Sequence, residues 1–133
     1  MEIANYIILF VSGMILTGAG AMRVVKPAGS YCLQSYLGKP GVKLEDDVDM
    51  LSEMRGAGAL TLLTGLIALA GLASPRVMPA SFAAAGLIFL GFGLGRVISL
   101  AVDGRPNRDL INGTIAELVF GTLNIGCLAI LLT

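Results

Sequence analysis

Four long apolar runs, separated by polar stretches, dominate the pattern of hydrophobic and polar positions along the chain. A membrane-spanning helix needs about 20 mostly apolar residues, because each residue adds about 1.5 Å to its length and the hydrocarbon core is about 30 Å thick. Four segments meet this requirement, namely residues 3–22, 50–74, 77–102 and 109–132. The pattern therefore predicts an all-α fold, an integral membrane four-helix up-down bundle that forms a single domain over residues 1–133.

The polar stretches between these runs differ in length. Pro75 and Pro79 enclose a tight turn between the second and third runs, and residues 103–107 form a tight polar turn between the third and fourth. Turns this short make consecutive helices antiparallel neighbours. The long connection, residues 23–48, contains a short apolar patch over residues 31–37. We expect this patch to be part of an ordered loop, or else to lie at the level of the lipid head groups or cover one mouth of the bundle.

An acidic run, Glu45-Asp46-Asp47-x-Asp49, closes the long connection. Carboxylates at this place favour the first turn of the helix that follows, where they lie at the positive end of the helix dipole. A divalent-cation site is the alternative, and it would need further oxygen ligands from elsewhere in the chain.

The composition agrees with a membrane protein and narrows its chemistry. Charged residues make up 14% of the chain, against about 25% in ordinary soluble domains. Nine Lys and Arg residues balance nine Asp and Glu residues, and this zero net charge argues against nucleic-acid binding. The chain has no histidine, which removes histidine general bases, histidine-ligated haem and the usual zinc and di-iron sites. We therefore expect no metal, no cofactor and no enzymatic activity, since no activated nucleophile stands out either.

Lysine and arginine residues predict the orientation of the bundle. The first and third connections together carry six of them: Arg23, Lys26, Lys39, Lys43, Arg105 and Arg108. The second connection carries Arg76 alone. Because positive charges collect on the cytoplasmic side, we expect the long connection in the cytoplasm and both termini across the membrane. Cys32 and Cys127 then lie at opposite faces, so no disulfide is expected.

Four ionisable side chains within the apolar spans are candidates for a shared site. They are Glu53, Arg55, Arg96 and Glu117. Such residues cost about 2.5 to 3.5 kcal/mol each and usually pair inside a bundle. Threading the helices up and down places all four toward one membrane face, with Arg96 and Glu117 nearly level, so we expect one neutral cluster. Ser99 and Asp103 follow Arg96 at spacings that put them on the same helix face.

Small residues predict where the helices approach one another closely. Gly58, Thr61 and Gly65 recur on one face of the second span, and the third span contains Gly91-x-x-x-Gly95. We expect both sets to lie at interfaces within the bundle. The fourth span carries a stripe that is expected to face inward, formed by Thr114, Glu117, Gly121 and Asn124.

The charged cluster has two interpretations. As a structural element, it is a salt-bridge network that fixes the register of the helices. As a binding site, its arginines hold an anionic or polar group, such as a lipid phosphate, a carboxylate or a quinone oxygen. The exact charge balance favours the structural interpretation, because a standing anion site more often carries surplus positive charge.

Three spaced motifs resemble those of the bacterial domain-of-unknown-function family DUF4345, whose members are small four-helix membrane proteins. The motifs are Glu53-x-Arg55-Gly-x-Gly58, Gly95-Arg-x-x-Ser99-x-x-x-Asp103-Gly-x-Pro106 and Glu117-x-x-x-Gly121. They span most of the chain from residue 50 onward, whereas the first connection looks longer than is usual in the family. The resemblance implies a bacterial inner-membrane protein, whose termini would then be periplasmic. It implies no activity.

Two functions fit these observations. The first is a non-catalytic accessory or assembly subunit of a larger membrane complex, with the charged cluster as an internal clasp. The second is a binder or transporter of a small anionic or lipid-like ligand through Arg55 and Arg96, with Glu53 or Glu117 as a proton-coupled group. Transport by four helices would require a homo-oligomer. The expected partners are accordingly the lipid bilayer, a larger membrane complex or further copies of the chain, and a bound lipid or quinone.

Overall fold

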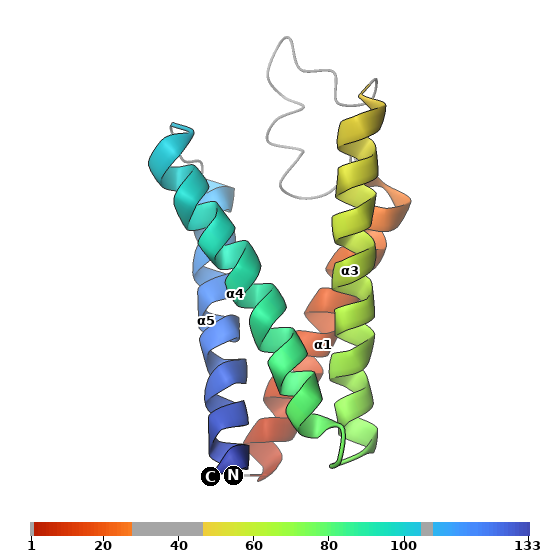
Figure 1. Ribbon diagram of the computed structural model, residues 1–133, viewed down its shortest axis with the longest axis vertical. Coiled ribbons are helices and arrows are strands. Elements are labelled where there is room, and N and C mark those ends of the chain that lie inside the picture. The colour runs from red at the N-terminus through yellow and green to blue at the C-terminus, as the bar shows by residue number, and fades with distance from the viewer. Residues whose placement is uncertain (1, 28–46, 105–107) are drawn as a thin grey trace.

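The structure, a computed structural model, describes residues 2–27, 47–104 and 108–133. Its helices are α1 (Glu2–Val25), α3 (Val48–Ala73), α4 (Met78–Val102) and α5 (Arg108–Leu132) (Figure 1). Each is long and apolar enough to cross a membrane. They run alternately up and down, so the predicted all-α up-down bundle is confirmed. The apolar patch over residues 31–37, with Cys32, and the start of the acidic run lie outside the described residues.

Polar residues mark the start of α3 and the end of α4. Asp47 caps α3, because its side chain accepts a hydrogen bond from the backbone N–H of Met50 at 3.0 Å. Asp49 lies in the first turn, which confirms the helix-dipole interpretation for the described part of the acidic run. At the end of α4, the N–H of Asp103 donates to the carbonyl oxygen of Ser99 at 2.8 Å. Gly104 follows with a φ of 111°, a left-handed conformation that glycine adopts without steric cost.

Glycines let α1 and α3 pack at very short range. A Cβ atom added at Gly58 would lie 2.6 Å from the Cβ atom of Arg23, and one added at Gly20 would collide with the backbone of Leu62. Gly65 likewise faces the backbone of α1. The predicted interface role of Gly58 and Gly65 is therefore confirmed, and α1 packs more extensively on α3 than on any other helix.

The interface between α4 and α5 uses a different face of α4 from the one that the sequence suggested. Gly86 and Gly93 face α5, where added Cβ atoms would press against its side chains. Nothing in the described chain comes within 4 Å of a Cβ atom added at Gly91 or Gly95, so the prediction that these two glycines pack inside the bundle is wrong. The reason is helix geometry: each lies two residues from Gly93, about 200° around the helix. Contact at Gly93 therefore turns both outward.

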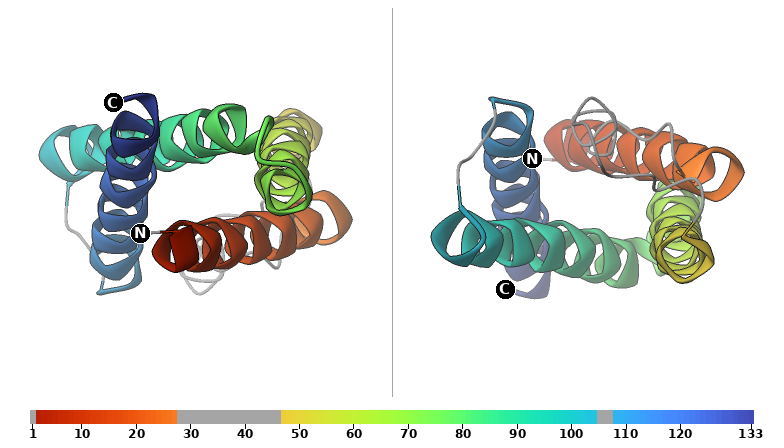
Figure 2. Two further views of the ribbon diagram at one scale, coloured as in Figure 1. Left: turned by 90° about the horizontal axis from the view of Figure 1, so that it is seen from below. Right: turned by 90° about the horizontal axis from the view of Figure 1, so that it is seen from above.

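The two tight pairs, α1–α3 and α4–α5, form a V (Figure 1). They come together at the end of the molecule that carries both termini and diverge toward the end at which α3 begins. In the end views of Figure 2, α3 is seen almost end-on, while the other three helices are inclined. We call the end that carries both termini the closed end, and the end at which α3 begins the open end.

The buried core lies in the half of the molecule toward the closed end. Leu9, Ala68 and Phe82 are completely buried there. Two hydrogen bonds connect the helix pairs in the same half. Ser81 Oγ of α4 donates to the carbonyl oxygen of Ile67 in α3 at 2.7 Å, and the buried Asn124 Nδ2 of α5 donates to Ser12 Oγ of α1 at 2.8 Å. These contacts join the pairs toward the closed end, whereas the pairs diverge toward the open end.

Candidate functional site

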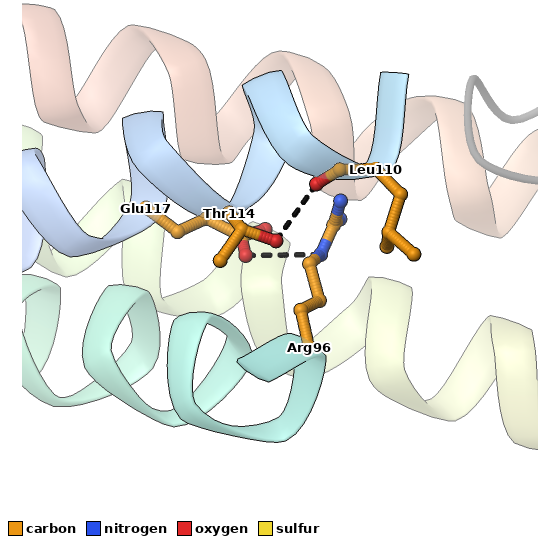
Figure 3. A network of polar contacts seen from close by, with 4 residues as sticks. All are labelled: Arg96, Leu110, Thr114 and Glu117. Atoms are coloured by element: carbon orange, nitrogen blue, oxygen red, sulfur yellow. Dashed lines mark hydrogen bonds and ion pairs between the residues drawn. The ribbon is translucent and has the colours of Figure 1, made fainter. Parts of the chain in front are cut away.

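An ion pair joins α4 to α5 toward the open end. Arg96 Nε lies 2.9 Å from Glu117 Oε2, and each side chain is 15% exposed. Figure 3 shows Arg96 extending from α4 across to α5. Helix rise places Glu117 about 13 Å inside the start of α5 and Arg96 about 9 Å inside the end of α4, so both lie within the membrane-spanning part. The expected contact between these two residues is present.

The local sequence of α5 makes room for the arginine. Gly113 precedes Glu117 by about one helical turn, and a Cβ atom there would collide with Nη1 of Arg96. Between them, Thr114 Oγ1 donates to the carbonyl oxygen of Leu110 at 2.7 Å, so this hydroxyl is turned back onto its own helix (Figure 3). Any side chain larger than glycine at position 113 would therefore displace the guanidinium from Glu117.

The other predicted site residues do not join this pair. Glu53 and Arg55 lie exposed in the first turns of α3, Asp103 is exposed at the end of α4, and Ser99 is partly buried. The four-membered neutral cluster is thus reduced to Arg96 and Glu117. The cause is the V, because α3 packs on α1 and leans away from α4 and α5 at the open end.

Arg23 takes a place at the site that the sequence did not assign to it. The sequence placed Arg23 in the first connection, but α1 continues to Val25 and carries Arg23 in its last turn. The guanidinium carbon of Arg23 lies 4.9 Å from the centre of the Phe92 ring of α4, a cation–π contact that bridges the two helix pairs. Arg23 also interacts electrostatically with Glu117. The available signal was its spacing from Leu16 and Ala19, which puts all three on one helix face.

These residues surround a partly open cavity of about 180 Å³ between the helix pairs, which we call the inter-pair cavity. All four helices contribute to its lining, and α3 does so through Thr61. Arg23 and Glu117 are its charged members, and Phe89, Phe92 and Phe120 are its aromatic members. The rings of Phe89 and Phe120 stack with their centres 5.5 Å apart. For scale, a cavity of roughly 150 Å³ in a protein core holds a benzene molecule.

The charges at the inter-pair cavity do not balance. Among the described residues, Arg23 and Glu117 line the cavity, and Arg96, which is not a lining residue, adds a second guanidinium through its ion pair with Glu117. The Thr61 hydroxyl donates to the carbonyl oxygen of Ala57 at 2.7 Å and adds no charge. The expected neutral site is therefore replaced by a site with one surplus positive charge.

Groups that could hold a metal ion do not gather in the described part of the chain. His, Cys, Asp and Glu side chains form no cluster of three or more over residues 2–27, 47–104 and 108–133. Cys127 is a buried free thiol near the end of α5, away from the inter-pair cavity. The chemistry that the described site offers is thus that of two cations, one carboxylate and an aromatic lining.

The sequence matches the model of a known protein family. The family model described as Domain of unknown function (DUF4345) matches residues 4–128. The chain belongs to the DUF4345 family. All three motifs that suggested the family lie within the match, as do the residues of the inter-pair cavity. No curated protein matches the chain, and no solved structure matches it. For this DUF4345 protein, the geometry of its own site is therefore the guide to function.

Proposed function

We propose that this DUF4345 protein is a non-catalytic membrane protein that binds a small lipid-like molecule in the inter-pair cavity. The observation that supports this proposal is the cavity itself, which combines a mostly apolar lining that includes three phenylalanines with charged residues at the open end. Small-molecule sites have this combination of a mostly apolar wall and a few polar groups that fix orientation. The binding residue we propose is Arg23, which lines the cavity, with Arg96 paired to Glu117 beside it. Arg55 is not part of this proposal, because it is exposed on α3.

The position of the cavity also supports a ligand that comes from the bilayer. The helix pairs diverge around it, and the cavity is partly open between them. A molecule dissolved in the lipid can therefore reach it without crossing water. We propose that the protein resides in the inner membrane of a bacterium, as the family resemblance implied.

The absence of tryptophan from the chain allows a direct test of binding. Ile15 lines the cavity and is 41% exposed, so Ile15→Trp places the protein's single indole beside the ligand. A brominated fatty acid quenches indole fluorescence at short range. Titrated into the full chain in mild detergent, it is expected to quench with saturation.

A matched pair of variants on α5 separates binding from partitioning into the micelle. Both alanines are exposed, but Ala116 lines the cavity and Ala129 lies elsewhere on the same helix. In the Ile15→Trp background, Ala116→Leu is expected to abolish saturation and Ala129→Leu to preserve it. Linear quenching of equal slope in all three proteins would overturn the proposed function.

The outward face of α4 favours a second function, that of an accessory or assembly subunit in a larger membrane complex or homo-oligomer. A Cβ atom added at Gly91 or Gly95 would have no neighbour within 4 Å in the rest of the described chain, and Gly91 borders a groove of about 220 Å³. A small-xxx-small pattern in a membrane helix typically packs against another helix. In this function the Arg96–Glu117 pair is a structural clasp.

The accessory function is tested by purification in mild detergent. The wild-type chain is expected to carry a stoichiometric partner, Gly91→Leu to lose it, and Gly126→Leu, at an equally open glycine of α5, to retain it. A wild-type protein that elutes alone as a monodisperse monomer would contradict this second function.

A further inference from the structure

On the basis of the ligand-binding function proposed above, we infer that the ligand is a monoanionic amphiphile, a carboxylate carried by an acyl chain or a ring, and that Arg23 binds its carboxylate. Arg23 lines the inter-pair cavity beside Glu117 and Phe92. The charges of the described residues Arg23, Arg96 and Glu117 sum to one positive charge. One monoanionic head group would therefore neutralise the site.

The guanidinium groups of Arg96 and Arg23 differ in the partners that they already have. Arg96 is paired with Glu117 at 2.9 Å. Arg23 contacts the Phe92 ring, and no acid of the described chain lies within 4 Å of its guanidinium. An aromatic ring stabilises a positive charge but offers no carboxylate oxygen to the guanidinium N–H groups. Of the two described arginines at the site, Arg23 is therefore the one with unused capacity for a bidentate carboxylate contact.

The polarity gradient of the cavity matches the orientation of an amphiphile in a bilayer. Arg23 lies in the last turn of α1, near the membrane face, and Leu16 lies about 10 Å deeper along the same helix. Phe89 is likewise two turns deeper than Arg96, and Phe120 is about one turn deeper than Glu117. A head group at Arg23 thus places the apolar part of the ligand among aromatic rings toward the bilayer centre.

The size of the cavity limits which part of the ligand it encloses. About 180 Å³ accommodates a ring or the first few methylene groups beside the head group. The remaining chain would leave through the opening between the helix pairs and lie among the lipid tails. The site therefore recognises the head group and its neighbouring atoms rather than the length of the chain.

Other head groups fit the charges less well. A cationic head group would lie beside Arg23 and be repelled. An uncharged head group would leave the surplus positive charge of the described site residues unmatched, which is unfavourable where the site is partly buried. A phosphate monoester carries about −1.5 to −2 charges near neutral pH and exceeds the surplus of one. A carboxylate matches both the surplus and the planar guanidinium.

The test uses four brominated probes with the same acyl chain and different head groups: carboxylate, methyl ester, quaternary ammonium and phosphate monoester. Each is titrated into the full-length Ile15→Trp chain in mild detergent. The carboxylate is expected to saturate at the lowest concentration. Arg23→Gln is expected to weaken carboxylate binding about tenfold or more, the loss of one charged hydrogen-bonding interaction, and to leave ester binding unchanged.

Two further variants show whether the effect belongs to the charge of Arg23. Arg23→Lys keeps the charge and is expected to bind the carboxylate more tightly than Arg23→Gln does. Arg55→Gln removes an exposed arginine of α3 and is expected to bind like the parent. If Arg23→Gln weakens all four probes equally, Arg23 acts through its contact with Phe92 alone, and the inference is overturned.

The outcomes separate this inference from the function on which it rests. If no probe saturates, the proposed ligand-binding function fails. If the ester, ammonium or phosphate probe binds as tightly as the carboxylate and Ala116→Leu still abolishes that binding, the proposed function stands and the assignment of a monoanionic carboxylate is overturned.

Discussion

At the scale of single residues, identical side chains acquire different roles from their surroundings. Arg23, Arg55 and Arg96 all lie toward the open end of the molecule, but Arg96 pairs with Glu117, Arg23 contacts Phe92, and Arg55 is exposed. Burial decides the difference, because an unpaired charge is costly where water is excluded and nearly free where water reaches it. The Arg96–Glu117 pair is therefore the interaction whose loss should matter most for stability.

We expect Glu117→Gln to lower the free energy of unfolding by about 2 kcal/mol, because it leaves the Arg96 guanidinium without its counter-charge. Glu53→Gln changes the same chemical group at an exposed position of α3 and should change stability by no more than about 0.5 kcal/mol. The measurement is equilibrium unfolding of both variants in mixed micelles with increasing denaturing detergent. Equal losses in the two variants would show that the ion pair contributes nothing to stability.

At the scale of the helices, glycine positions decide which faces meet. Gly65 brings the backbones of α1 and α3 together, whereas Gly91 points away from every described part of the chain. Both are helical glycines in apolar surroundings, and the sequence treats them alike. Their difference arises because α4 turns Gly93, not Gly91, toward α5.

The same substitution should therefore destabilise the protein at Gly65 and have little effect at Gly91. Gly65→Ala adds a Cβ atom against the backbone of Thr17 and should destabilise the protein by about 1–3 kcal/mol through forced separation of α1 and α3. Gly91→Ala adds the same methyl group in open space and should be within about 0.5 kcal/mol of wild type. Both substitutions carry the same gain in helix propensity, so it cancels in the comparison. Unfolding midpoints in detergent measure the difference, and a larger loss in Gly91→Ala would refute this account of the interfaces.

At the scale of the whole molecule, the described positive charges are concentrated at one end. The open end carries Arg23, Lys26, Arg55, Arg96 and Arg108, and the closed end carries Arg76 in the turn between α3 and α4. Positively charged residues are retained on the cytoplasmic side of a membrane. This distribution therefore favours an orientation in which the open end faces the cytoplasm. Because both termini lie at the closed end, both would then be periplasmic.

Fusions to the C-terminus test this orientation. Alkaline phosphatase folds to its active form outside the cytoplasm, so a fusion after Thr133 is expected to be active. Green fluorescent protein exported by the same route does not become fluorescent, so its fusion at the same residue is expected to be dark. A fluorescent and phosphatase-inactive pair would reverse the orientation and would place the inter-pair cavity toward the periplasm.

The sequence by itself determined the four helices, their up-down order and the inward stripe on α5. Thr114, Gly121 and Asn124 are buried as their spacing predicts, and Glu117 meets Arg96. These features depend on span length, helix rise and helix periodicity, which are local properties of the chain. Two short turns then leave consecutive helices no arrangement except side by side.

The tertiary structure alone decided which residues surround the site. The sequence could not show that Glu53 and Arg55 lie outside the site or that Arg23 belongs to it. Both facts depend on how far the helix pairs diverge. That divergence follows from close packing of α1 on α3 at Gly20 and Gly58, together with hydrogen bonds that join the pairs toward the closed end. Small differences in helix tilt near the closed end become large separations at the open end. Because of these separations, the predicted neutral cluster does not form, and a cavity with one surplus positive charge among the described residues lies in its place.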